Sequence, residues 1–328
     1  MRKEAELLRS DDSVSAVFSC TFHKIFLFLQ TIKQQQMKTG LVLEGGGMRG
    51  LFTAGVIDVL MENGIQFDGA VGVSAGAAFG CNYKTRQIGR AIRYNKRFAN
   101  DRRYASWWSL FTTGNYFNAD FAYHYLPNKL DVVDFDTFRN NPMEFWAVAT
   151  NVGSGKAVYR QLKVLDYEEL EFVRASASMP LMSKIVKLKG QRLLDGGVAD
   201  SIPLDFFQRQ GYKRNVVVLT QPMGYQKRPI GIMPLIRLQL NHHPKMLKAL
   251  AERHIMYNQQ LELVQQEELC GNAFVIRPQV ALTIGDTSHD PEKMQETYEH
   301  GRKVATEELQ KLKLFLENQR KQSTAIIE

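Results

Sequence analysis

The residues with the clearest catalytic potential form the segment Gly72–Gly76 (GVSAG), which has the pattern G-x-S-x-G. An apolar run, Ala70–Val73, leads into Ser74, and a helical pattern follows it, which is the strand-to-helix context that this motif requires. A sharp turn there exposes the serine Oγ, and the start of a helix favours developing negative charge. We therefore predict that Ser74 is a nucleophile, with a helix-capping serine between glycines as the alternative.

A second glycine-rich segment, Gly45–Gly50 (GGGMRG), precedes the serine motif. It follows the apolar run Leu41–Leu43, and a helical pattern extends from Leu51 to Met61 after it. Glycines allow positive φ and leave backbone N–H groups pointing outward. Such a nest at a helix N-terminus holds negative charge.

Two ligands fit this nest, and a tight turn without any ligand is the third possibility. Gly45, Gly47 and Gly50 match the dinucleotide fingerprint G-x-G-x-x-G. That fingerprint also requires an acidic residue at the end of the second strand. Here the second strand ends at Ser74, and Asp68 precedes the strand. The sequence thus favours an oxyanion site over a dinucleotide site.

A serine nucleophile needs a base to take its proton. The histidine with the clearest helical context, His254, falls on an apolar helix face, where packing is the simpler interpretation. None of the histidines stands in a glycine-rich or strand-end context, although a histidine-assisted triad remains the alternative. The seven histidines are His23, His124, His242, His243, His254, His289 and His300.

One aspartate has the expected context. Asp195 ends the apolar run Gln191–Leu194 and precedes Gly196 and Gly197. An acid at a strand end before two glycines presents its carboxylate beside bare backbone. An ordinary turn aspartate also fits this short pattern.

Together these motifs resemble the patatin family of acyl hydrolases. The sequence has G-G-G-x-R-G at Gly45–Gly50, G-x-S-x-G at Gly72–Gly76 and D-G-G at Asp195–Gly197, in the order found in that family. Ala175–Pro180 also resembles the family segment that precedes the acid. The resemblance covers residues 39–220 and is greatest to bacterial stand-alone patatin-like phospholipases, whose C-terminal part is more loosely similar to 221–328.

The resemblance implies an α/β fold, a patatin-like sheet with helices on both faces, and hydrolysis of acyl esters of phospholipids or related lipids. It implies a dyad of Ser74 as nucleophile and Asp195 as general base. A carboxylate is a weaker base than imidazole, so backbone donors, worth about 3–4 kcal/mol each, must contribute more. No cofactor is expected, and no acidic calcium loop is evident. The implied oxyanion hole comprises Gly45, Gly46, Gly47, Met48, Arg49 and Gly50, with Gly72 and Gly76 flanking the serine and Gly196 and Gly197 following the acid.

The remaining pattern predicts alternating strands and helices. Strands are expected at Phe145–Thr150, in its hairpin partner Lys156–Tyr159, at Val216–Leu219 and at Phe274–Ile276, with helices at 245–266 and from Asp290 onward. We expect residues 37–220 to form the hydrolase domain and 221–328 a mainly helical α+β appendix. Residues 1–36 form a dispensable extension in this interpretation, with Met37 as an alternative start.

Composition limits the class of protein. The 328 residues are 44% hydrophobic and 23% charged, which is typical of a globular protein and excludes fibrous and wholly disordered classes. Cys20, Cys81 and Cys270 fit neither a disulfide framework nor a zinc site, so we expect a reducing, cytoplasmic location.

Residues 84–103 hold much of the net charge of +8. Arg86, Arg90, Arg93 and Arg97 have the spacing of one helix face, and clustered aromatic residues follow them. This pattern predicts contact with an anionic membrane surface, with an ordinary solvated face as the alternative. The expected partners are a lipid ester and such a surface, without nucleic acid, and a non-catalytic lipid-binding protein is the last alternative.

Overall fold

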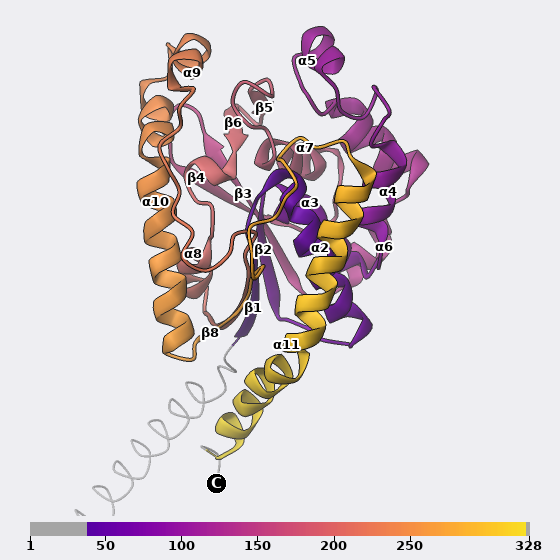
Figure 1. Cartoon of the computed structure of the whole chain (residues 1–328), viewed down its shortest axis with the longest axis vertical. Helices are drawn as coiled ribbons and strands as arrows, with labels where there is room; N and C mark the ends of the chain where they lie inside the picture. Colours follow the sequence, from indigo (N-terminus) through magenta and orange to yellow (C-terminus); the bar gives the residue numbers. More distant parts are fainter. Residues whose placement is uncertain (1–37, 326–328) are drawn as a thin grey trace, which may run out of the picture. The chain divides into compact units, whose positions relative to one another are not determined.

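The structure is a computed structural model that describes the backbone of residues 38–325 and the side chains of residues 38–317. The predicted extension, residues 1–36, lies outside the described residues. One mixed sheet has the strand order β5-β6-β3-β2-β1-β7-β8, with β4 paired to β3 (Figure 1). The strands are β1 (Lys38–Leu43), β2 (Gly69–Val73), β3 (Glu144–Asn151), β4 (Ala157–Leu162), β5 (Val186–Leu188), β6 (Gln191–Asp195), β7 (Tyr212–Val218) and β8 (Ala273–Ile276).

Strands β3, β2, β1, β7 and β8 are mutually parallel, so their carboxyl ends meet at one edge of the sheet. Strands β4 and β6 run antiparallel to β3. The register of β6 pairs Asp195 with Ala149, which brings the carboxyl end of β6 into the body of the sheet. The predicted strands and the hairpin of β3 with β4 are confirmed.

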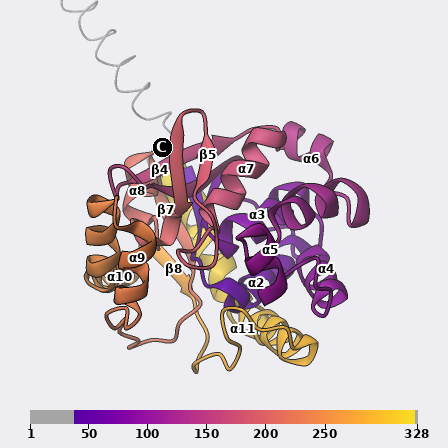
Figure 2. The ribbon, with the colours of Figure 1, turned by 90° about the horizontal axis from the view of Figure 1, so that it is seen from above.

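Helices cover both faces of the sheet, as expected (Figure 2). Leu41 and Leu43 face a core shared with α2, α3, α7 and α11, whereas Val42 faces a core shared with α8 and α10. This alternation follows from the two-residue period of a strand. The α-helices are α2 (Gly50–Glu62), α3 (Ala75–Thr85), α4 (Arg90–Phe98), α5 (Trp107–Thr113), α6 (Phe135–Asn140), α7 (Tyr167–Ser176), α8 (Leu204–Arg209), α9 (Met233–Leu240), α10 (Pro244–Leu269) and α11 (Pro291–Ala325). Two 3-10 helices, η1 (Gly47–Arg49) and η3 (Gly196–Val198), and one π-helix, η2 (Phe121–Leu130), complete the helices of the described residues.

The C-terminal region is built into the main sheet. Strand β8 extends the sheet through parallel pairing with β7. Helix α11 lies directly on α2, because a Cβ on Gly55 would lie 2.1 Å from the carbonyl oxygen of Tyr298, and a Cβ on Gly301 would lie 2.0 Å from that of Phe52. The Tyr298 hydroxyl donates to Asp58 Oδ2 at 2.6 Å. Residues 38–321 accordingly form one compact unit.

No helix in the described part of the chain combines the length and the apolar character needed to cross a membrane.

Candidate active site

Ser74 occupies a strained turn between β2 and α3. Its backbone has φ 54° and ψ −121°, a conformation that residues with a Cβ rarely adopt. The turn is tight on both sides: a Cβ on Gly72 would lie 2.4 Å from the Gly76 carbonyl oxygen, and one on Gly76 would lie 2.4 Å from that of Leu43. Both motif glycines are therefore required by packing, and the predicted strand–turn–helix context is confirmed.

Asp195 lies at the end of β6 and is buried. Its Oδ1 accepts the Gly197 N–H at 2.7 Å, and its carbonyl oxygen accepts the Thr150 hydroxyl at 2.7 Å. A Cβ on Gly196 would lie 2.1 Å from the Val148 carbonyl oxygen, so this position also needs glycine. The loop after β6 is thus packed tightly against β3.

Burial raises the pKa of Asp195 above its ordinary value, because the charged form is desolvated. The positive charge of Arg253, the neighbouring Ser74 side chain and the Gly197 N–H lower this pKa, whereas the negative charge of Asp286 raises it. The strand register brings Ser74 and Asp195 together, because Val73 pairs with Val148 and Asp195 pairs with the adjacent Ala149. A carboxyl with a raised pKa is suited to proton transfer near neutral pH.

The segment before the acid supports both residues. The Ser74 N–H donates to the Ser176 Oγ at 2.9 Å, and the Asp195 N–H donates to the Ser178 carbonyl oxygen at 2.8 Å. Ser176 ends α7 and is fully buried. Its supporting role was not predicted.

The glycine-rich loop contains free and engaged donors. Gly47 has φ +54°, and a Cβ there would lie 2.6 Å from the Asp286 carbonyl oxygen. The Met48 N–H donates to that oxygen at 3.1 Å, and the Arg49 N–H donates to the Gly46 carbonyl oxygen at 3.0 Å. The N–H of Gly50 bonds back to the preceding turn. Half of the predicted oxyanion donors are thus engaged elsewhere.

The N–H groups of Gly45, Gly46 and Gly47 have no acceptor among the described residues. Gly45 lies against Ser74, because a Cβ on it would be 2.9 Å from the Ser74 Cβ. The Arg49 side chain pairs with Asp286 at 2.5 Å between Nη1 and Oδ1. Gly45–Gly47 are therefore the available donors beside Ser74, and Arg49 braces the loop.

Glu44 anchors this loop, and sequence reasoning missed it. Its Oε2 accepts the Thr220 N–H at 2.6 Å, and its Oε1 accepts the Tyr257 hydroxyl at 2.5 Å. Burial raises the pKa of Glu44. The only sequence signal was a charged residue directly between a buried strand and the glycines.

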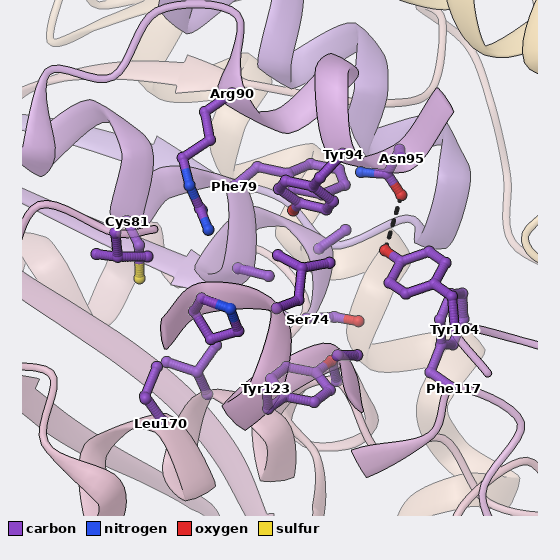
Figure 3. Close-up of a pocket in the computed structure, with 18 of the residues that line it drawn as sticks. Ser74, Phe79, Cys81, Arg90, Tyr94, Asn95, Tyr104, Phe117, Tyr123 and Leu170 are labelled. Atoms are coloured by element: carbon purple, nitrogen blue, oxygen red, sulfur yellow. Dashed lines mark hydrogen bonds between the residues drawn. The ribbon is translucent and has the colours of Figure 1, made fainter. Parts of the chain in front are cut away.

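A largely apolar cavity of about 120 Å³ includes Ser74 in its wall (Figure 3). Elements α3, α4, η2 and α7 supply most of the lining. The hydroxyl of Tyr104 donates to Asn95 Oδ1 at 2.9 Å, which satisfies two of the few polar groups there. The lining includes Phe79, Tyr94, Phe117, Tyr123, Leu126 and Leu170.

The predicted face of four arginines is wrong. Arg86 ends α3 in a left-handed conformation, whereas α4 begins only at Arg90. The Arg90 side chain is buried in the cavity wall, with Nη1 2.9 Å from Asn82 Oδ1 and Nε 3.1 Å from the Asp131 carbonyl oxygen.

Arg93 pairs with the same acidic residue, at 2.7 Å between Nε and Asp131 Oδ2. Asp131 is itself buried, so it holds α4 to the end of η2. Arg86, Arg93 and Arg97 are exposed, with Arg86 just after α3 and the other two four positions apart on α4. The four side chains therefore do not form one exposed helix face, because Arg90 is buried and Arg86 lies outside α4.

The histidines do not support a triad. His124 Nε2 lies 2.8 Å from Glu171 Oε1, and His289 bonds to the Ala99 carbonyl oxygen and to Tyr116. Among residues 38–317, no histidine is hydrogen-bonded to Ser74 or Asp195. In that same part of the chain, no three histidine, cysteine or acidic side chains converge on a metal site.

Two family models match most of the part of the chain that the structure describes. Residues 41–207 match the family model of patatin-like phospholipases, and residues 243–317 match that of a domain of unknown function, DUF6363. The uncharacterized protein YjjU of Escherichia coli (strain K12) is 32% identical over 205 residues, which cover 57% of this chain and 53% of that protein.

Fungal lysophospholipases are also similar. NTE1 of Meyerozyma guilliermondii is 30% identical and nte1 of Aspergillus niger 31%, over 55% and 52% of this chain. The matches span only 12% and 11% of those proteins and about half of YjjU. A crystal structure of VipD from Legionella pneumophila aligns over 84% of this chain and 67% of its own with a TM-score of 0.43 and 14% identity. Because the first family model covers half of the sequence, this chain belongs to the patatin-like phospholipase family.

Proposed function

We propose that this protein is a serine hydrolase that cleaves the acyl ester bonds of lipids through Ser74 and Asp195. Membership of the patatin-like phospholipase family supports lipid hydrolysis. The observation that carries the finer assignment is the strained Ser74 beside a buried carboxylate, in the wall of an apolar cavity. Strain at a non-glycine residue persists where the surrounding structure requires it, as at active sites.

In the proposed acylation step, Asp195 takes the proton of the Ser74 hydroxyl while Oγ attacks the ester carbonyl carbon. The carbonyl oxygen gains the negative charge and is stabilised by the free N–H groups of Gly45–Gly47. Collapse of this intermediate breaks the ester bond, and Asp195 returns the proton to the leaving alcohol. In the second half, Asp195 takes a proton from water, the resulting hydroxide releases the acyl group as a fatty acid, and Ser74 regains its proton.

The substrate class that we infer is a lipid with a single acyl chain. The cavity beside Ser74 has a volume of about 120 Å³ and a largely apolar lining, as an acyl-chain site would have. Two of the similar fungal proteins are named lysophospholipases, which supports the same choice.

We further propose that α5, rather than an arginine face, meets the lipid surface, which would place the protein at the periphery of a membrane. Trp107, Trp108 and Phe111 on this helix are 60%, 67% and 83% exposed. Figure 1 shows α5 projecting from the body of the fold, and Phe117, shortly after it, lines the cavity. Amphipathic aromatic side chains are typical of segments that lie at a lipid interface.

Labelling with a fluorophosphonate probe, followed by assays on palmitoyl lysophosphatidylcholine, tests the function. Wild type should be labelled and should release palmitate, whereas Ser74→Ala should do neither. Asp195→Asn should lose hydrolysis, and alanine at His254 or His289 should leave most of it. An unlabelled wild type would favour a non-catalytic lipid-binding protein, and a folded histidine variant without activity would favour a triad.

A further inference from the structure

We propose that the C-terminal segment, residues 243–317, contributes to the active site by positioning both the glycine-rich loop and Asp195. Three of its residues, Arg253, Tyr257 and Asp286, provide the contacts. This inference rests on the proposed hydrolase function, and it assigns a role to a segment that matches only a domain of unknown function.

Arg253 on α10 holds the acid loop, defined here as Asp195–Val198. Its Nε donates to the Gly197 carbonyl oxygen at 2.6 Å, and the N–H of the same glycine donates to Asp195 Oδ1 at 2.7 Å. A Cβ on Gly197 would lie 3.0 Å from Asp195 Oδ1 and 3.2 Å from Arg253 Nη2. Arg253 thus fixes the glycine that in turn orients the catalytic carboxylate.

Asp286, in the connection between β8 and α11, holds the glycine-rich loop Gly45–Gly50. Its carbonyl oxygen accepts the Met48 N–H, and its carboxylate pairs with Arg49. The same carbonyl oxygen lies where a side chain on Gly47 would be, so the loop and this connection fit without a gap. These contacts direct the Met48 N–H away from the cavity and leave the donors of the preceding glycines free.

Tyr257 adds a third contact one turn after Arg253 on α10. Its hydroxyl donates to Glu44, the residue that precedes Gly45, and both of these side chains are buried. The contacts come from separate parts of the segment, since α10 and α11 lie apart and the chain between β8 and α11 passes over the region of the carboxyl strand ends (Figure 1). The segment therefore holds the site from two directions.

The two charged residues face Asp195 with opposite signs. Arg253 lowers the pKa of Asp195 and Asp286 raises it, and the other groups facing the acid are the Ser74 hydroxyl, the Gly197 N–H and the phenol of Tyr123. Removing each charge should therefore move the acid limb of the pH–rate profile in opposite directions. A purely structural role would not produce that pair of shifts.

The test compares Arg253→Gln and Asp286→Asn in the full chain, with kcat and kcat/KM measured across pH. Each variant should lower kcat roughly 10-fold to 100-fold, the scale for misplaced catalytic groups. The acid limb of the pH–rate profile should move to higher pH in Arg253→Gln and to lower pH in Asp286→Asn. Arg253→Lys, which keeps the positive charge, should return the limb most of the way to its wild-type pH. Lys248→Gln and Glu252→Gln, exposed positions on α10, make the same charge changes and should behave as wild type.

Hydrogen–deuterium exchange provides a readout that does not need activity. Exchange should rise in peptides covering 195–200 for Arg253→Gln and in peptides covering 45–50 for Asp286→Asn, with the other loop unchanged. Unchanged exchange and an unchanged pH–rate profile in both variants would overturn the inference, even with an active wild type. An inactive, unlabelled wild type would instead overturn the proposed hydrolase function, while the exchange data would still decide whether the segment holds the loops.

Discussion

The backbone N–H of Ser74 donates a hydrogen bond to the side-chain oxygen of Ser176, 2.9 Å away and 102 positions further along the chain. This bond ties the strained turn to the end of α7, whose following residues also hold Asp195. It also occupies the Ser74 N–H, so that this group is not available to the proposed oxyanion. We therefore expect Ser176 to act as a positioning residue for the proposed nucleophile.

Ser176→Ala should slow fluorophosphonate labelling and ester hydrolysis while leaving KM nearly unchanged. The change leaves the Ser74 N–H buried without an acceptor, which costs about 1–3 kcal/mol. The measurements are the labelling rate, kcat and the melting temperature. Ser178→Ala is the matched control, because among residues 38–317 the Ser178 hydroxyl bonds only to the Arg174 carbonyl oxygen, at 2.8 Å. Equal labelling rates in the two variants would contradict the positioning role.

Gly47→Ala should lower kcat by roughly 100-fold or more, the scale for one lost oxyanion donor. An alanine Cβ disfavours φ +54° and would also push against the Asp286 carbonyl oxygen, so the free N–H groups would be turned away. Steady-state kinetics on a short soluble ester checks this.

Gly190→Ala separates backbone strain from catalysis. Gly190 also has positive φ, 75°, but a Cβ there has open space around it. This variant should lose some stability and keep the wild-type kcat. A Gly47→Ala enzyme with only a raised KM would rule out an oxyanion role for this loop.

Asp195→Asn should abolish hydrolysis and yet stabilise the protein at neutral and alkaline pH. Burial raises the folded-state pKa of Asp195, so the folded protein holds its proton more tightly than the unfolded chain does. The stability contributed by the protonated form is complete below the ordinary aspartate pKa and is lost as pH rises through the raised folded pKa. Asparagine remains neutral and does not suffer this loss.

Melting temperatures at about pH 4 and about pH 8 test the predicted direction of this stability change. The difference between Asp195→Asn and wild type should be small at the lower pH and favour the variant at the higher one. In wild type, kcat/KM should fall as pH drops through the raised pKa, because the base becomes protonated. A variant that is less stable at both pH values would show that Arg253 and the Ser74 side chain compensate fully for the buried charge.

The strands, the serine turn and the acid turn could be predicted because their signals are local. Glycines flank Ser74 and follow Asp195 where a Cβ would meet neighbouring backbone, and apolar runs of strand length precede both residues. The free and engaged donors of Gly45–Gly50 could not be separated in the same way. That separation depends on the Asp286 carbonyl oxygen, which is remote in sequence and carries no pattern.

The prediction of an arginine face was wrong for a related reason. The spacing of Arg86, Arg90 and Arg93 is helical, but the helix is interrupted between the first two, where Gly89, the residue before α4, has φ 70°. Arg90 is then paired to Asp131, 41 positions away, and a buried pair of this kind leaves no periodic signal. Arg253 was missed likewise, because its acceptor lies 56 positions before it.

The exposed apolar side chains of α5 should determine activity on lipid surfaces but not on soluble esters. Burying a Trp or Phe side chain in an apolar environment is worth about 1.5–3 kcal/mol, so the double variant Trp108→Ser, Phe111→Ser should bind vesicles at least roughly 100-fold more weakly. Turnover of a short p-nitrophenyl ester should stay close to wild type, because neither side chain lines the cavity.

The control for α5 is Leu269→Ser, which removes an equally exposed apolar side chain at the end of α10 that leads to β8. Vesicle sedimentation at low and high salt, alongside the soluble-ester assay, distinguishes the possible surfaces. Apolar insertion is insensitive to ionic strength, whereas attraction between arginines and anionic lipids is screened within about 10 Å at 0.1 M salt. We expect salt-insensitive binding that is lost in the α5 variant and kept in Leu269→Ser. Salt-sensitive binding lost instead in an Arg86→Gln, Arg97→Gln variant would assign the contact to these two exposed arginines and refute the role of α5.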